Sequence, residues 1–229
     1  MADLMRKSGR KYRIAVAWAQ DPNTLGSIYK AIEDGFAEAV LIGDPGAITA
    51  ECTSKGYDIS KVTVAAAPDE ATAAEMAVAM TVQGDADIVM KGLVGTDKFL
   101  KAVMNKERGL LKPDAVMSYV AAVEIPSYHK LLFVTDTAVI PFPNLHQKSC
   151  MAGYAIEMAR KFGIDRPKIA LIGASEKISH HFPNTLDYEE MCRMAKNGYF
   201  SDCIMDGPLD LFLACDPESV KIKGVATPV

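Results

Sequence analysis

Short apolar runs alternate with segments of helical periodicity along the first part of the chain. The apolar runs, which are typical of buried strands, cover residues 13–18, 37–42, 62–66 and 87–90. Helical spacing covers residues 24–32, 68–82 and 96–105. A further helix is expected after the second apolar run, ending near residue 54. Strands that alternate with helices predict βαβ units, and therefore a mostly parallel sheet with helices on both faces.

The pattern changes in the middle of the chain. Two β-rich runs, residues 118–125 and 131–135, are joined by a short connection, which predicts an antiparallel pair added to the parallel sheet. After the Pro-rich stretch 141–144, helices are expected at 145–162 and 185–195, and strands at 168–172 and 203–205. Asn184 or Thr185 is the expected cap of the second helix.

These elements predict an α/β protein of two domains with mostly parallel sheets. We expect an N-terminal α/β domain at residues 1–137 and a second α/β domain at residues 138–229, incomplete at its C-terminal end. A chain of 229 residues, 49% hydrophobic and 24% charged, can bury such cores without disulfides or a structural metal.

Charge and cysteine usage narrow the class of protein. Twenty-five Lys and Arg residues against 29 Asp and Glu give a net charge of −4. The chain therefore lacks the overall positive charge typical of nucleic-acid-binding proteins, although a local anion site is possible. No apolar stretch reaches the roughly 18 residues that a membrane-spanning helix needs. The five cysteines form no CxxC pair, so we predict free thiols and a cytoplasmic location.

The first candidate for chemistry is the turn from residue 90 to residue 96. It follows a predicted strand and precedes a predicted helix, where ligands of open α/β sheets bind. Gly92 and Gly95 allow a ligand close to the backbone, Lys91 supplies a positive charge, and Thr96 can cap the helix or hold phosphate. Lys101 lies beyond the first helical turn and either reaches the site or faces solvent. A turn that merely needs glycine is the alternative interpretation.

Two further strand ends carry carboxylates. Asp136 and Thr137 follow the apolar run that ends at residue 135, and Asp206 follows the last predicted strand, before a Gly-Pro turn. A purely structural role, in which each aspartate caps a turn or a helix, is the alternative for both. Metal-binding and hydrolase motifs are absent: the adjacent His180 and His181 make a poor chelate, and no GxSxG elbow occurs.

In this order and spacing, the three strand ends resemble those of the phosphate acetyl/butyryltransferase (phosphotransacylase) family. The matching stretches are residues 87–96 (DIVMKGLVGT) with 99–107, residues 130–139 (KLLFVTDTAV) with Pro143 and Lys148, residues 175–185, and residues 206–209 (DGPL). The Met-Lys-Gly form and the pair Glu176-Lys177 are more similar to the butyryl branch than to the acetyl branch. The similarity runs from about residue 13 through most of the chain.

The resemblance implies the reversible reaction acyl-CoA + phosphate ⇌ acyl phosphate + CoA. It also implies a fold of isocitrate/isopropylmalate-dehydrogenase type with the site between two domains, a homodimer, and no resident cofactor or metal, since CoA and phosphate are substrates. Neither nucleic acid nor membrane is an expected partner. The predicted catalytic residues are Lys91, Asp136 and Asp206. The predicted phosphate- and CoA-binding residues are Gly92, Gly95, Thr96, Lys101 and Thr137.

The sequence also departs from the family pattern. The family commonly has Arg where Lys101 stands. The bidentate contact that an arginine makes with phosphate is then replaced by the single point charge of a lysine. Family members continue past residues 224–229 into a segment that carries a Ser-Arg pair at the thioester and phosphate. We therefore expect CoA and phosphate sites with weak or no turnover in this chain.

Two other functions remain open at this point. One is a non-catalytic relative that binds CoA or acyl-CoA. The other is a dehydrogenase of the same fold, although neither a GxGxxG motif nor clustered carboxylates for a metal occur in the sequence.

Overall fold

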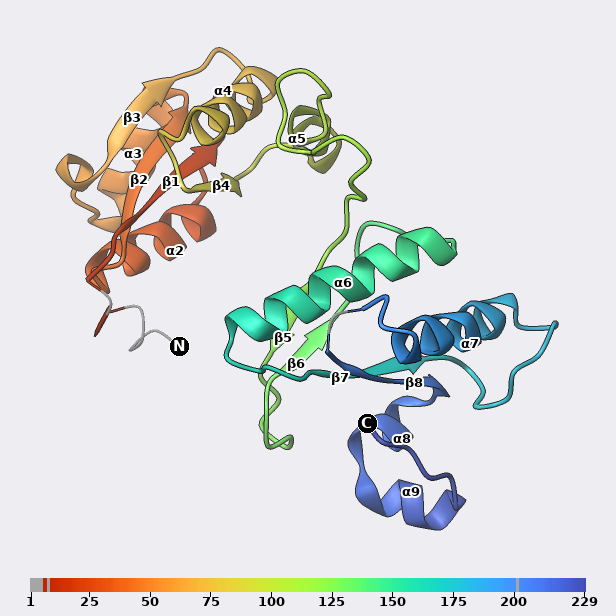
Figure 1. Ribbon diagram of the computed structural model, residues 1–229. Coiled ribbons are helices and arrows are strands. Elements are labelled where there is room, and N and C mark those ends of the chain that lie inside the picture. Colours follow the sequence, from red (N-terminus) through yellow and green to blue (C-terminus); the bar gives the residue numbers. More distant parts are fainter. Residues whose placement is uncertain (1–5, 8, 201) are drawn as a thin grey trace. The chain divides into compact units, whose positions relative to one another are not determined.

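Two units of packed helices and strands make up the computed structural model, which describes residues 6–7, 9–200 and 202–229 (Figure 1). The contacts divide the chain into Met1–Asp114 and Ala115–Val229. This division lies ahead of the boundary expected after residue 137, because the two β-rich runs before that boundary pair with each other and not with the first sheet.

A parallel four-stranded sheet forms the centre of the first unit. Its strands lie in the order β3-β2-β1-β4. They are β1 (Tyr12–Ala17), β2 (Ala37–Gly43), β3 (Thr63–Ala66) and β4 (Ile88–Lys91). Each lies within one or two residues of the apolar run that predicts it, so the sequence-based assignment of these four strands is confirmed.

Helices connect the strands of this sheet, and one more follows its last strand. They are α2 (Pro22–Glu33), α3 (Pro45–Lys55), the short 3-10 helix η1 (Ile59–Lys61), α4 (Glu70–Gln83) and α5 (Thr96–Val103). The C-terminal ends of α3 and α4 are set by Gly56 and Gly84, which have φ of 71° and 81°. Glycine adopts this left-handed conformation without the steric penalty of a side chain, so both helices end there.

The core of the first unit lies on both faces of the sheet. Alternate strand residues such as Val16 and Leu41 are fully buried against Leu25 and Ile28 of α2 and Ile48 of α3. The intervening strand residues point to the opposite face, which α4 covers with its small alanines (Figure 1). The small side chains of α4 allow a close approach to the sheet.

Strands β2 and β3 extend the sheet to one side of β1, and β4 lies on its other side. The loop after β4 is hydrogen-bonded to the end of β1. The Gly92 N–H donates to the Ala17 carbonyl at 2.9 Å, and the Leu93 N–H donates to the Trp18 carbonyl at 3.0 Å. A Cβ added to Gly92 would lie 2.6 Å from the Trp18 carbonyl oxygen, inside van der Waals contact. Glycine is therefore required at position 92 for the β4–α5 loop to take this path.

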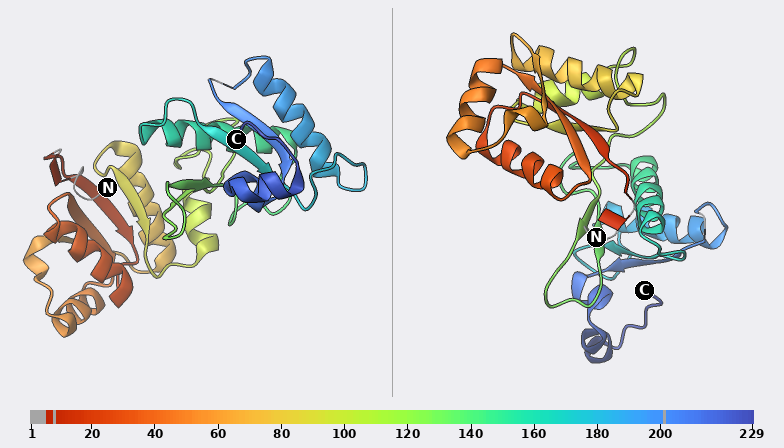
Figure 2. Two further views of the ribbon diagram at one scale, coloured as in Figure 1. Left: turned by 90° about the horizontal axis from the view of Figure 1, so that it is seen from below. Right: turned by 90° about the vertical axis from the view of Figure 1, so that its left-hand side faces the viewer.

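The second unit contains two separate two-stranded sheets. Strands β5 (Ala121–Val123) and β6 (Leu132–Val134) are antiparallel, while β7 (Lys168–Ile172) and β8 (Ile204–Leu209) are parallel. The helices are α6 (Leu145–Lys161), α7 (Pro183–Lys196), α8 (Leu211–Cys215) and α9 (Pro217–Lys223). Figure 2 shows α7 alongside the β7–β8 pair, and Met191 of α7 is buried against Leu171 and Met205 of these strands.

Three details of the second unit differ from the sequence-based expectation. The antiparallel pair exists but forms its own sheet. Helix α7 begins at Pro183, so neither Asn184 nor Thr185 is its cap; the Thr185 hydroxyl lies inside the first turn and donates to the Phe182 carbonyl at 2.7 Å. Proline suits this first helical position, because its missing N–H would have no partner there.

The third difference is the length of β8, which continues through Leu209 instead of ending at a Gly-Pro turn. The pairing with β7 shifts register between Ala170 and Ile172, opposite this stretch. Gly207 has φ of 155°, and a Cβ there would lie 2.6 Å from the Leu171 Cβ. The close packing on β7 keeps Gly207 in the strand; a helix is expected after this turn and α8 follows, whereas α9 has no counterpart in the predicted elements.

We predict opposite effects of alanine at two glycines. Gly92→Ala lowers the free energy of unfolding by about 1–3 kcal/mol, since the added methyl meets backbone atoms that cannot move aside freely. Gly153→Ala in α6 raises it by up to about 1 kcal/mol, because nothing lies within 4 Å of the added Cβ. Urea unfolding followed by circular dichroism measures both, and equal stabilities of the two variants would contradict the prediction.

Candidate active site

The structure places the eight residues predicted from sequence in two groups, one in each unit. Lys91, Gly92, Gly95, Thr96 and Lys101 lie on the end of β4, the β4–α5 loop and α5. Asp136, Thr137 and Asp206 lie in the second unit, after β6 and on β8. The first group lies along one stretch of the chain, from the carboxyl end of β4 through the loop into α5.

Exposed polar groups line the β4–α5 loop. The side chains of Lys91, Thr96 and Lys101 are all exposed. The Lys91 ammonium is within 3.5 Å of the Gly92 carbonyl oxygen, and no carboxylate among the described residues pairs with Lys91 or Lys101. Lys91, at this end of the sheet, is therefore available to an anion, whereas Lys101 lies in the last turn of α5.

The first turn of α5 differs from that of the other helices in its unit. Helices α2, α3 and α4 each begin at an aspartate whose carboxylate accepts N–H bonds from the first turn. These aspartates are Asp21, Asp44 and Asp69. Helix α5 begins after Gly95, which offers no side chain, and no acceptor within the described part of the chain bonds the N–H groups of Thr96, Asp97 and Lys98. An anion can bind to such open donors at a helix start.

Sequence reasoning missed the carboxylate that holds this loop. Glu70, the first residue of α4, accepts from the Gly95 N–H at 2.8 Å with Oε2 and from the Lys98 ammonium with Oε1. Lys98, followed by the Gly95 N–H, lowers the pKa of Glu70. Glu70 lies 25 positions from Gly95 and 28 from Lys98 in the sequence, so no local pattern indicated these contacts.

Asp136 binds backbone groups of its own surroundings. One carboxylate oxygen accepts the N–H groups of Ala138 and Val139 at 2.8 Å each, and the other accepts the Tyr119 N–H at 3.0 Å. Burial would raise the pKa of Asp136, but the three N–H donors outweigh burial and hold the pKa below its ordinary value. The neighbouring Thr137 is exposed. The contacts of Asp136 fit the structural alternative, in which it fixes the turn after β6.

Asp206 lies on β8 beside a cavity of about 520 Å³. Only its own unit contributes to this cavity, including Cys192, Arg193 and Lys196 of α7. One oxygen of Asp206 accepts the Gly207 N–H at 3.0 Å, and the second has no partner within the described residues. Burial, followed by the charge of Asp206, raises the pKa of the Cys192 thiol to about 11, so this cysteine is not a thiolate nucleophile at neutral pH.

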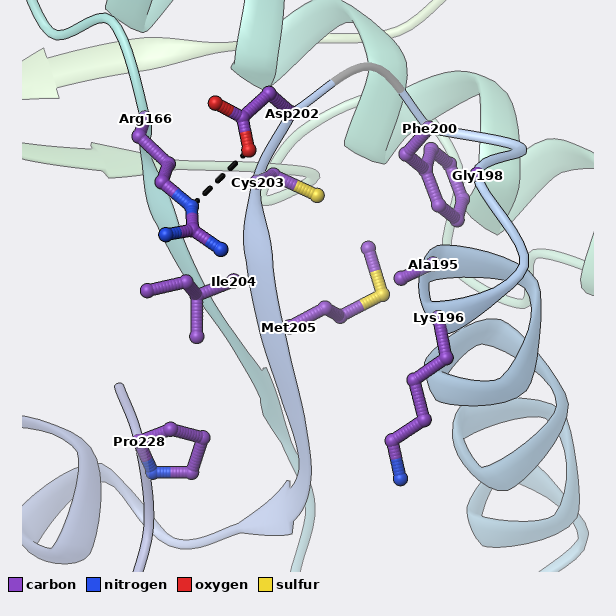
Figure 3. Close-up of a pocket in the computed structure, with 10 residues that line it drawn as sticks. All are labelled: Arg166, Ala195, Lys196, Gly198, Phe200, Asp202, Cys203, Ile204, Met205 and Pro228. Carbon is purple, nitrogen blue, oxygen red and sulfur yellow. Dashed lines mark ion pairs between the residues drawn. The ribbon is translucent and has the colours of Figure 1, made fainter.

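A second cavity, of about 570 Å³, lies at the other end of β8 (Figure 3). Phe200, Cys203 and Met205 line it, and the Arg166 guanidinium at its edge pairs with Asp202 at 3.0 Å. None of the eight predicted site residues borders it. We therefore assign no role in the reaction to this cavity.

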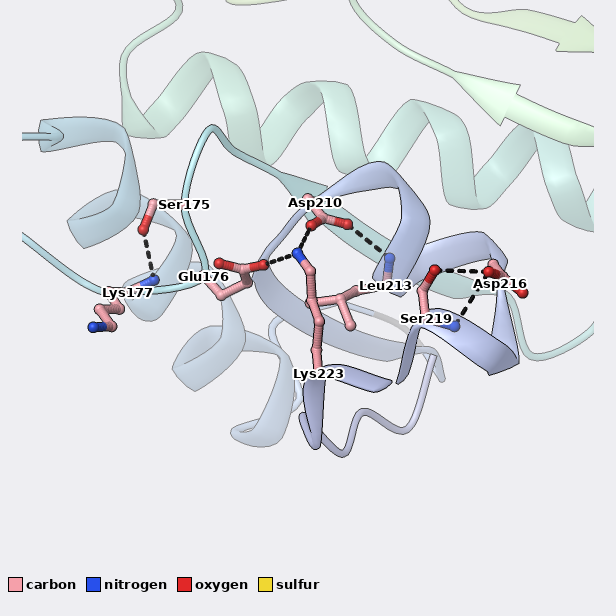
Figure 4. Close-up of polar contacts among 8 residues, drawn as sticks. All are labelled: Ser175, Glu176, Lys177, Asp210, Leu213, Asp216, Ser219 and Lys223. Carbon is pink, nitrogen blue, oxygen red and sulfur yellow. Dashed lines mark hydrogen bonds and ion pairs between the residues drawn. The ribbon is translucent and has the colours of Figure 1, made fainter. Parts of the chain in front are cut away.

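An ion-pair network ties α9 to two other segments of the second unit (Figure 4). The Lys223 ammonium lies 2.6 Å from a Glu176 oxygen and also bonds Asp210, whose other oxygen accepts the Leu213 N–H at 2.8 Å and caps α8. Lys223, followed by the Leu213 N–H, lowers the pKa of Asp210 from 3.8 to about 2. The network gives Glu176, one of the residues behind the family resemblance, a structural partner.

The described residues contain no group of three or more His, Cys, Asp or Glu side chains arranged for a metal ion. No helix within the described ranges is long and apolar enough to cross a membrane. The cysteines at positions 52, 150, 192, 203 and 215 are free thiols.

Comparison with known proteins gives concordant matches. The model of the family described as "Phosphate acetyl/butaryl transferase" matches residues 67–229. The phosphate butyryltransferase of Clostridium acetobutylicum is 38% identical over 219 residues, which are 96% of this chain and 72% of that protein. The phosphate butyryltransferase of Clostridium beijerinckii is 35% identical over 213 residues, covering 93% of this chain and 70% of that protein.

A solved structure extends the similarity to the fold. The crystal structure of a branched-chain phosphotransacylase from Enterococcus faecalis V583 has a TM-score of 0.80 and 27% sequence identity, covering 95% of this chain and 75% of that chain. The α/β fold with a parallel sheet is therefore confirmed, whereas the likeness to isocitrate/isopropylmalate dehydrogenases stays a prediction.

The ion-pair network predicts an acid-dependent loss of stability. Because the folded pKa of Asp210, about 2, lies below 3.8, its contribution is complete above about pH 4 and disappears as the pH falls through 2. Asp210→Asn therefore lowers the melting temperature at pH 7 and makes its decline between pH 4 and 2 shallower. Thermal melts monitored by circular dichroism measure both, with Asp165→Asn in an exposed loop as control. Identical acid profiles for wild type and Asp210→Asn would refute the prediction.

Proposed function

The chain is a member of the phosphate acetyl/butyryl transferase family, and from that premise we propose that it transfers a short-chain acyl group of butyryl type between coenzyme A and inorganic phosphate. The structural observation that carries the proposal is the open first turn of α5 beside Lys91. Neither the non-catalytic relative nor the dehydrogenase has comparable support, since the matched relatives are named as acyltransferases.

Phosphate is the substrate that suits the β4–α5 loop. The N–H groups of Thr96 and Asp97 and the partial positive charge of the helix start favour an anion. Lys91 adds a full charge from the end of β4, and Gly92 and Gly95 leave the backbone accessible. We assign the phosphate-binding role to these residues, with Lys101 and the Thr96 hydroxyl as further contacts; the CoA- or phosphate-binding role of Thr137 stays a prediction.

Acyl transfer itself needs a nucleophile and a proton acceptor. A phosphate oxygen attacks the thioester carbonyl carbon, the C–S bond breaks as the tetrahedral intermediate collapses, and the phosphate proton ends on the CoA thiolate. Between the carboxylates predicted for this proton, we favour Asp206, because one of its oxygens has no partner within the described residues, whereas Asp136 accepts three N–H groups.

Two finer assignments rest on the family resemblance. A homodimer is proposed, and light scattering of the purified protein at twice the 24.7 kDa chain mass would support it. A cytoplasmic location is proposed because the five free thiols fit a reducing compartment, and fractionation of the source cells tests it.

The activity predicts phosphate-dependent release of thiol from butyryl-CoA. Lys91→Met raises the KM for phosphate by about 10- to 100-fold, since it removes a charge-assisted contact worth about 1.5–3 kcal/mol. Thiol release followed with a chromogenic disulfide across a phosphate series measures this change.

Lys55→Met is the matched control. Lys55 is the last residue of α3, which precedes β3, and β3 and β4 are the two opposite edge strands of the sheet. Its side chain has the same charge as that of Lys91. Its KM for phosphate stays within twofold of wild type. Thiol release that does not depend on phosphate, or an equal effect of both substitutions, would overturn the assignment.

The two aspartates predict different losses. Asp206→Asn lowers kcat by about 100-fold or more while stability changes little, as expected for loss of a general base. Asp136→Asn lowers the free energy of unfolding by about 1 kcal/mol, because an amide nitrogen cannot accept the N–H bonds. Steady-state kinetics and urea unfolding on both variants decide between the roles, and a larger loss of kcat for Asp136→Asn would reverse them.

A further inference from the structure

Glu70 places a negative charge directly at the start of α5. Its Oε2 accepts the Gly95 N–H at 2.8 Å, and a Cβ built on Gly95 would lie 3.7 Å from the same oxygen. The carboxylate is therefore in contact with the loop itself, although it belongs to the first turn of α4. Its bond leaves the N–H groups of Thr96 and Asp97 open.

The same carboxylate neutralises one cation of the loop. Lys98 lies in the first turn of α5, and Oε1 of Glu70 pairs with its ammonium. Lys91 and Lys101 have no such partner within the described part of the chain. Of the two lysines nearest the start of α5, Lys91 and Lys98, the second is thus paired with a carboxylate and withheld from an incoming anion.

We propose that Glu70 is a positioning residue that fixes the β4–α5 loop and at the same time limits the affinity of this loop for phosphate. The inference rests on the proposed phosphate site at α5. Glu70 acts in two ways: the bond to Gly95 holds the loop, and the negative charge both repels phosphate and occupies Lys98. A weaker affinity lets phosphate leave when the reaction runs toward acyl-CoA.

The two effects separate in the variant Glu70→Gln. The glutamine carbonyl oxygen can still accept the Gly95 N–H, so the loop keeps its anchor. The negative charge is lost and Lys98 is released, while Asp97 remains as in wild type. We expect phosphate to bind roughly three- to tenfold more tightly, the size of one charge acting over about 4 Å when water screens it fully, as at this exposed site.

Isothermal titration calorimetry of the full chain with inorganic phosphate tests this expectation. Glu75→Gln is the matched control, since it removes the same charge from an exposed position of the same helix and leaves phosphate affinity unchanged. Lys98→Met weakens binding, and the double variant Glu70→Gln/Lys98→Met returns it to within about twofold of wild type, because the two opposite charges are removed together.

Ionic strength separates an electrostatic role from a purely structural one. The gain in Glu70→Gln shrinks as salt is raised, since these groups are at the surface and screened. A purely structural role predicts unchanged or weaker binding in Glu70→Gln, because the bond to Gly95 is kept, with no salt dependence of the difference. Unchanged or weaker phosphate affinity in Glu70→Gln, an equal gain in Glu75→Gln, or no phosphate binding by any variant would overturn the inference.

Kinetics distinguish this inference from the proposed function. If Glu70→Gln binds phosphate more tightly but no protein releases thiol from butyryl-CoA, the inference stands and the proposed activity fails. If wild type is active and Glu70→Gln has an unchanged KM for phosphate, the activity stands and the inference fails. In an active enzyme, we expect the KM for phosphate to fall three- to tenfold.

Discussion

The near-contact of Gly92 with the end of β1 determines how the first unit presents its candidate site. The carbonyl oxygens of Ala17 and Trp18 accept N–H bonds from the β4–α5 loop, and no side chain fits between them at position 92. Because the loop is fixed on one side by β1 and on the other by the Glu70–Gly95 bond, α5 starts at a defined place at the carboxyl end of the sheet. Without these bonds, the loop would leave the start of α5 free to move.

Carboxylates shape both units, and each is used in a different way. Asp21, Asp44 and Asp69 satisfy the first turns of their own helices. Asp136 gathers three backbone N–H groups around the turn after β6. Since these carboxylates already accept the N–H groups of their helix starts, an anionic substrate finds open donors where such a cap is missing, as at the start of α5.

Local patterns predicted the first unit well, and contacts between distant residues explain what they missed. Alternating periods located β1 to β4, because each strand is a short apolar run between helical segments, and β1 and β2 are largely buried. The Glu70–Lys98 pair joins two helices through the fold, and no spacing in the sequence encodes it. For Asp136, the sequence was equally compatible with a catalytic and a structural role. The positions of the backbone N–H groups around its carboxylate favour the structural role. The start of α7 was misplaced because Pro183, not a polar residue, determines where it begins.

The strand pairing also determines which segments of the protein unfold locally most easily. Strands β1 and β2 have a hydrogen-bonded neighbour on each side, whereas each of β5, β6, β7 and β8 has one on a single side within the described residues. Amide hydrogens exchange with solvent through local opening, and a strand that is paired once separates with fewer broken bonds. Slow exchange is therefore concentrated in the middle of the first sheet, and the segments that carry Asp136 and Asp206 exchange faster.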